Sequence, residues 1–219
     1  MQSSPGAAYT ATPRTTPARK RDRARYDRAT VHAILDSEWI CHLGFVVDGA
    51  PVVLPTMYAR VGERLYLHGS TGSRPMRAAA DGLRVCVTVT RAEGIVLARS
   101  AVNHSVNYRS VAAHGTARLV TDPGERALAM DALLDAAVPG RSGDCRPPDA
   151  KELAQTAIVR LDLDEVAAKV RDGGVIDEPG DVGLPHWAGV IPMTRSLGTP
   201  VPAADQDPAA PLPPYLTAP

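Results

Sequence analysis

The chain has 219 residues, 44% of them hydrophobic, which suits one domain with tails or at most two small domains. Its 24 Lys and Arg residues balance its 24 Asp and Glu residues, so no net positive charge favours nucleic acid or an anionic membrane as a partner. No apolar run approaches the ~18 residues of a membrane span, and no apolar stretch near the N-terminus resembles a signal peptide, so we expect a cytoplasmic protein.

Both ends of the chain have the composition of irregular tails. Residues 1–25 are rich in Ser, Thr, Pro, Ala and Arg without an apolar period, which predicts a disordered tail. The basic run at 19–23 is more typical of a solvated tail than of a nucleic-acid patch, because an Asp interrupts it. Residues 196–219 are rich in Pro and Ala and predict a second tail. The folded domain is therefore expected over residues 26–195.

Short strands and tight turns fill the domain. Strands are indicated by β-branched or alternating apolar residues, at 39–47, 51–60, 64–68, 83–90, 95–99, 108–120 and 157–163. Helices are indicated by capping residues or helical spacing, after Asp27, over about 74–80, and from the Asp122 cap to about residue 137. The Asp48-Gly49 pair is a hairpin signal between the first two strands.

This order of elements predicts a mostly-β fold with flanking helices. Three consecutive strands joined by tight turns exclude a doubly wound parallel sheet, whose strands need long crossovers. A closed or split antiparallel barrel of six to seven strands, of Greek-key type, removes exposed sheet edges and is the architecture that we expect.

The segment from Leu67 to Arg77 (LHGSTGSRPMR) has the pattern of a phosphate site. It combines a strand end, a loop of small residues and a helix start, where backbone N–H groups, hydroxyls and an Arg side chain can bind a phosphate. The hydroxyl donors would be Ser70, Thr71 and Ser73, with charge from Arg74 or Arg77. An ordinary capped loop fits the same spacing equally well. The segment lacks the Gly-Lys-Ser/Thr of a nucleotide triphosphatase.

Three segments together resemble the pyridoxamine 5'-phosphate oxidase superfamily, and more closely its nitroimidazole-resistance-like branch. They are PVVLPTMY at 51–58, LYLHGSTGSRPM at 65–76 and HSVNYRSV at 104–111. A weaker fourth match combines 169–173 with WAGVIP at 187–192. The resemblance covers about residues 28–193 and implies an FMN-binding split β-barrel that works as a homodimer.

The resemblance also implies roles for particular residues. The backbone of residues 53–56 would face the flavin ring, Ser70, Ser73 and Arg74 would hold the ribityl phosphate, and residues 108–110 would lie near a dimer interface that builds the cofactor site. His68 would be the catalytic residue beside the flavin. The implied cofactor-binding residues are Val53, Leu54, Pro55, Thr56, His68, Gly69, Ser70, Ser73, Arg74, Arg109, Ser110 and Trp187.

Several of these residues have a second interpretation. His68 is either a proton donor beside the flavin or a structural histidine at a strand end. Arg109 is either an interface ion-pair partner or a flavin phosphate contact. Trp187 is either an anchor of the C-terminal segment, the commoner role of an aromatic among Gly and Pro residues, or a lid over the ring.

The chain also departs from the family pattern. It lacks the Arg-rich C-terminal segment that grips pyridoxamine phosphate, so another small organic molecule is expected as substrate. Pro75 stands where a lysine is more usual, which removes one phosphate-binding cation. Besides an FMN-dependent oxidoreductase, the sequence allows a non-catalytic protein that binds or stores flavin, deazaflavin or haem.

No metal site is predicted. The three cysteines are widely spaced, and the six histidines show no paired-ligand spacing, so a zinc enzyme is not expected. A single axial histidine for haem stays open on this reasoning, because any histidine in an accessible pocket would serve.

Overall fold

The computed structural model describes residues 8–207 and 209–217, and it is mostly β. Nine strands are found in these ranges: β1 Ala24–Arg25, β2 Ile40–Val47, β3 Ala50–Val61, β4 Arg64–Ser70, β5 Leu83–Leu97, β6 Ser105–Leu119, β7 Thr156–Asp162, β8 Glu165–Arg171 and β9 Gly189–Pro192. The α-helices are α1 Arg28–Asp36, α2 Arg74–Ala78, α3 Pro123–Ala137 and α4 Ala150–Gln155. Short 3₁₀ turns are η1 Arg21–Arg23, η2 Ala101–Asn103, η3 Ser142–Asp144 and η4 Pro214–Leu216.

Six of the strands form a closed ring of antiparallel pairs. Their order is β6-β7-β4-β3-β2-β5, and β5 pairs again with β6. β8 pairs with β6 outside the ring, and β9 pairs with β5. Closure pairs the first and last strands of the ring with each other and so removes exposed sheet edges. This is the reason for which we expected a barrel from the sequence.

Alternation along the strands separates the core from the outer face. In β5, Val85, Val87 and Val89 are buried, whereas Cys86 and Thr88 between them are partly exposed. The helix α1 adds three buried side chains to the same core, Val31, Ile34 and Leu35. The hydroxyl of the buried Tyr58 donates to the carbonyl of Leu35, which ties α1 to the barrel.

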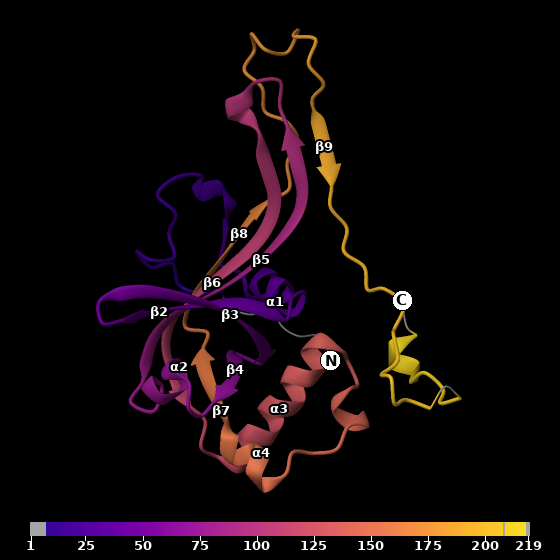
Figure 1. Cartoon of the computed structure of the whole chain (residues 1–219). Coiled ribbons are helices and arrows are strands. Elements are labelled where there is room, and N and C mark those ends of the chain that lie inside the picture. The colour runs from indigo at the N-terminus through magenta and orange to yellow at the C-terminus, as the bar shows by residue number, and fades with distance from the viewer. Residues whose placement is uncertain (1–7, 208, 218–219) are drawn as a thin grey trace.

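Beyond the ring, β5 and β6 continue as a hairpin that projects from the barrel (Figure 1). The sequence predicts two strands, at 83–90 and 95–99, where the structure has the single strand β5 with an irregularity between Ala92 and Gly94. We call this projection, residues 92–108 with residues 172–193, the arm. The strands β8 and β9 and the helix α4 were not predicted.

The N-terminal segment contacts the barrel from residue 8 onward. Tyr9 is buried, and its hydroxyl donates to Glu63 at 2.7 Å and lies 2.9 Å from His32. Arg14 forms an ion pair with Glu165, and β1 pairs with β8. This differs from the tail expected over residues 1–25, because one aromatic side chain and a few polar contacts hold the segment without an apolar period. Residues 1–7 of that expected tail lie outside the described ranges.

The C-terminal segment is largely irregular over its described residues. Two contacts place it on the barrel side of the molecule: Arg195 pairs with Glu38 at 2.7 Å, and the Tyr215 hydroxyl donates to Asp144 at 2.6 Å. Over the described ranges, the model has no helix with the length and apolar character to cross a membrane.

Candidate functional site

The predicted site residues lie where β3 and β4 separate. The two strands pair from Val61 and Arg64 as far as Tyr58 and Leu67. Beyond this point, residues 50–57 of β3 pair only with β2, whereas residues 68–70 of β4 pair only with β7. The predicted ring-facing segment, 53–56, and the predicted phosphate loop therefore diverge from one point in the barrel wall.

Among the described residues, none pairs as a strand with residues 50–57 of β3 on the side away from β2. In an antiparallel ladder, every second residue turns its backbone N–H and C=O groups toward the other edge, so this segment offers a row of unpaired polar groups. Val53 and Leu54 are exposed on the same segment. A polar edge beside apolar side chains suits a flat heteroaromatic ring.

The loop after β4 is a tight turn into α2. The Ser73 N–H donates to the Ser70 carbonyl at 2.9 Å, and the Gly72 N–H donates to the Ser70 hydroxyl oxygen at 3.2 Å. A Cβ on Gly69 would lie 3.0 Å from Met76 Cε, so the close approach of β4 and α2 requires glycine there. The strand, loop and helix order predicted from the sequence is present, with α2 ending at Ala78 rather than about residue 80.

Ser73 is the N-cap of α2, but its side chain makes no capping hydrogen bond. Its Oγ is buried and has no partner among the described residues. A buried hydroxyl without a partner is costly, so it identifies a position where a bound group would supply the missing hydrogen bond. Arg74 is exposed beside it and makes no hydrogen bond or ion pair within the described ranges.

His68 lies at the end of β4, opposite Ile158 of β7. Its Nδ1 is buried and unpartnered within the described part of the chain. Burial lowers the pKa of His68 below its ordinary value, so the ring is neutral near pH 7 and retains a nitrogen lone pair. A neutral imidazole of this kind can accept a hydrogen bond or bind a metal ion.

Three other predicted residues lie elsewhere in the chain. Arg109 on β6 forms an ion pair with Glu93 at 3.0 Å, and Ser110 donates to the Lys169 carbonyl at 3.3 Å. Trp187 is exposed on the arm, just before β9. Contacts within one chain therefore do not bring Arg109, Ser110 or Trp187 to the loop at 68–74.

Ser110 contributes instead to a cavity of about 260 Å³ on the outer face of β5, β6 and β8. The N-terminal segment closes one side of this cavity with Arg14, and β8 contributes Lys169. Neither residue is predicted as a site residue from the sequence. The signal for β8 was weak, because the buried Val166 and Ala168 are separated by another alanine instead of a polar residue.

No group of three or more His, Cys, Asp or Glu side chains in the described ranges is arranged to hold a metal ion. A haem iron can be held by a single protein ligand, so this finding does not bear on a haem site.

Comparisons with known proteins bear on this site. The family model described as pyridoxamine 5'-phosphate oxidase matches residues 27–170. No curated protein matches the sequence. Among solved structures, the flavocytochrome Anf3 from Azotobacter vinelandii is 38% identical, with a TM-score of 0.87, over 94% of this chain and 95% of its own.

Two further structures are similar. The FAD and haem binding protein from Mycobacterium smegmatis is 37% identical, with a TM-score of 0.84, over 89% of this chain and 95% of its own. A putative 5-nitroimidazole antibiotic resistance protein from Bacteroides thetaiotaomicron is 18% identical, with a TM-score of 0.56, over 67% of this chain and 86% of its own, which supports the fold alone. The match to the family model and the two relatives above 30% identity agree, and the chain belongs to the pyridoxamine 5'-phosphate oxidase family of flavin-binding split barrels.

Proposed function

We propose that this protein is a flavocytochrome-type oxidoreductase, which binds a flavin and a haem and works as a homodimer on a small molecule. The observation that carries the proposal is the 38% identity to the flavocytochrome Anf3 over 94% of the chain. The second relative, described as an FAD and haem binding protein, supports the same pair of cofactors. The flavin supplies the electron-transfer chemistry, and the protein supplies binding and orientation.

The residues at the separation of β3 and β4 fit a flavin. The free backbone groups of residues 53–56 match the donors and acceptors at the polar edge of an isoalloxazine ring. The Oγ of Ser73 and the guanidinium of Arg74, which have no partner within the described part of the chain, match a phosphate. The sequence predicted FMN, and we now favour FAD, because the M. smegmatis relative is described as an FAD binding protein.

Among the histidines of the described ranges, only His68 has a buried ring nitrogen without a partner, and we assign the haem iron to it for this reason. His32 contacts Tyr9 and Glu63, and His104 lies 3.1 Å from the Ser100 carbonyl. His68 has no hydrogen-bond partner among the described residues, and its lowered pKa keeps the neutral form that binds iron. In this proposal, His68 would hold the haem iron, rather than serve as the proton donor expected from the sequence.

The test is an absorption spectrum of the protein purified by gel filtration after loading with haem and either FAD or FMN. We expect visible flavin bands and a Soret band that co-elute with a dimer, and release of the bound flavin followed by chromatography identifies it as FAD or FMN. A protein that keeps neither cofactor at micromolar concentration would refute the proposal. A flavin without a Soret band would leave the oxidoreductase expected from the sequence and remove haem.

A non-catalytic carrier of the same cofactors is the second candidate. The described residues near the loop include no acid and base pair, which favours storage over turnover. Steady oxidation of a reduced nicotinamide by the loaded protein, with a defined acceptor, would decide for catalysis.

The cytoplasmic location and the absence of a nucleic-acid partner stay predictions from the composition of the chain.

A further inference from the structure

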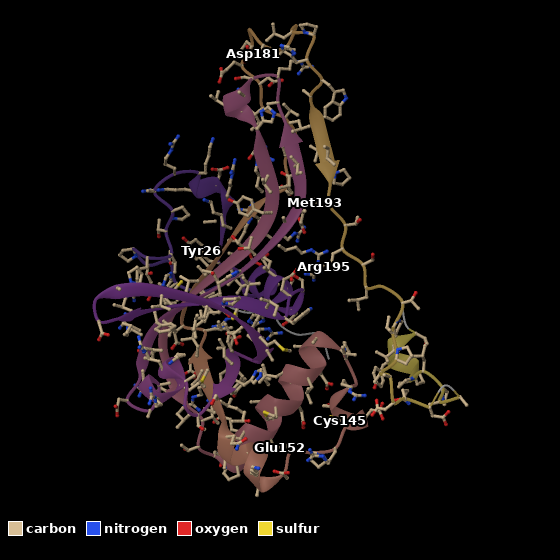
Figure 2. All side chains as sticks on the ribbon, viewed as in Figure 1. Tyr26, Cys145, Glu152, Asp181, Met193 and Arg195 are labelled. Atoms are coloured by element: carbon tan, nitrogen blue, oxygen red, sulfur yellow. The ribbon has the colours of Figure 1, made fainter. Side chains whose placement is uncertain are left out.

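A cavity of about 420 Å³ lies between α3 and α4, and none of the residues predicted to hold the flavin is part of its lining. Pockets of this size take small organic ligands. Its apolar lining comes from α3, from the loop before α4 and from α4 itself: Pro123, Ala127, Met130, Pro147, Pro148 and Leu153. Figure 2 shows this part of the molecule, with Glu152 on α4 and Cys145 in the loop that leads to it.

Arg126 also lines this cavity, and it has no carboxylate partner among the described residues. Its Nη2 donates to the carbonyls of Leu153 and Thr156, at 2.8 Å and 3.0 Å. Its Nε is buried and has no partner within the same ranges. Neutral carbonyls do not compensate a positive charge, and a buried N–H group without an acceptor is costly. The guanidinium therefore keeps the capacity to bind an anion, and a carboxylate matches its planar geometry.

The nearby carboxylates of the protein do not supply this anion. Asp131 also lines the cavity, but it is exposed and lies five residues farther along α3 than Arg126, or ~7.5 Å along the helix axis. Salt screens an exposed charge of this kind. Glu125, the neighbour of Arg126 in the chain, is already paired with Arg160 at 3.1 Å.

The bonds of Arg126 connect the cavity to the loop predicted to hold the flavin phosphate. Its acceptor Thr156 lies opposite Ser70 in the pair of β7 with β4. The carbonyl of the preceding residue, Gln155, accepts the Thr71 N–H at 3.0 Å. Residues 153–156 therefore contact Arg126 on one side and the loop on the other. A ligand that fixes Arg126 also orders this segment, and the coupling between two such sites is reciprocal.

We propose that the cavity is a second ligand site, which binds a small organic carboxylate with an apolar body, and that this ligand strengthens flavin binding through residues 153–156. The carboxylate accepts hydrogen bonds from Arg126, and the apolar body packs against Met130, Leu153 and the two prolines of the loop. Inorganic phosphate fits less well, because it offers no apolar surface to this lining. The site itself is independent of the proposed function, whereas its effect on flavin rests on that function.

The first experiment measures ligand binding to the full-length protein by isothermal titration calorimetry. The probes are benzoate and hexanoate, and their uncharged matches are benzamide and hexanamide. We expect each carboxylate to bind at least about 10-fold more tightly than its amide, because the amide loses a charge-assisted hydrogen bond. Equal affinity for acids and amides overturns the proposal, and so does the absence of binding at millimolar concentration.

Substitutions in α3 then locate the bound benzoate. Ala127→Trp fills the cavity but keeps the bonds of Arg126, and it should abolish benzoate binding. Its matched control, Leu134→Trp, adds the same ring at a partly exposed position outside the cavity lining and should bind benzoate normally. Arg126→Gln should bind benzoate and benzamide equally. Normal binding of benzoate by the Ala127→Trp protein overturns the proposal even if Arg126→Gln does not fold, because the ligand then lies elsewhere.

The second experiment titrates flavin in the presence and absence of saturating benzoate. We expect benzoate to lower the flavin dissociation constant of the wild type at least about 5-fold, and to leave that of Ala127→Trp unchanged. Equal constants in the wild type overturn the coupling, and so does the same decrease in both proteins. If the wild type binds no flavin, the proposed function fails, whereas calorimetry still decides whether the cavity binds carboxylates.

Discussion

Replacing Ser73 with alanine is expected to stabilise the cofactor-free protein and weaken flavin binding. The Ser73 Oγ is buried and has no partner among the described residues. Such an atom costs about 1–3 kcal/mol of desolvation, and alanine leaves a space of only one oxygen atom. We therefore expect a net gain of about 1 kcal/mol in the free energy of unfolding, or a Tm rise of about 2–4 °C for a chain of this size.

The same substitution removes a hydrogen bond to a bound phosphate. Hydrogen bonds to charged groups contribute about 1.5–3 kcal/mol, so the flavin dissociation constant should rise about 10- to 150-fold. Thermal unfolding of the cofactor-free protein and fluorescence titration with flavin measure the two effects. Ser70→Ala is the control for the stability measurement alone, because its hydroxyl oxygen already accepts the Gly72 N–H, and its loss should slightly destabilise the fold. A Ser73→Ala protein that is less stable and binds flavin normally would refute the reasoning.

Three further changes test other parts of the molecule. His68→Phe should abolish the Soret band. Below about pH 6.5, the unfolding free energy of the wild type should fall relative to this variant, because the unfolded histidine takes up a proton and burial lowers the pKa of the folded one. Equal pH profiles of the unfolding free energy in the two proteins would contradict this. Tyr9→Phe should cost about 1–2 kcal/mol in urea unfolding, since its hydroxyl bonds Glu63 and His32, and an unchanged midpoint would mean that the N-terminal segment does not contribute. Arg109→Ala should weaken the dimer or flavin binding, but barely alter the stability of the monomer, because its pair with Glu93 is exposed; gel filtration and flavin titration measure both.

The barrel strands were predictable because their signals are local. Alternating valines identified β5, and the Asp48-Gly49 pair identified the first hairpin, where both residues have the positive φ, 50° and 79°, that such a turn requires. The missed strands depend on distant partners. β8 has two successive alanines at its centre, which blur its alternation, and the four residues of β9 form a strand only because β5 extends beside them. The contacts of the N-terminal segment depend on one buried aromatic residue, Tyr9, and a single residue produces no periodic pattern from which they could be predicted.

For the site, the sequence located the strand, loop and helix but not the state of their polar atoms. Of the residues in the described ranges with a buried, unpartnered side-chain atom, Glu38, Arg99 and Arg126 bond through their other atoms. Only His68, Ser73 and Asn103 make no side-chain hydrogen bond at all. Two of these three lie within six residues, in the loop that the family resemblance assigns to the cofactor. Buried polar groups in a stable fold are normally satisfied, so this unused bonding capacity is an independent physical reason to place a ligand there.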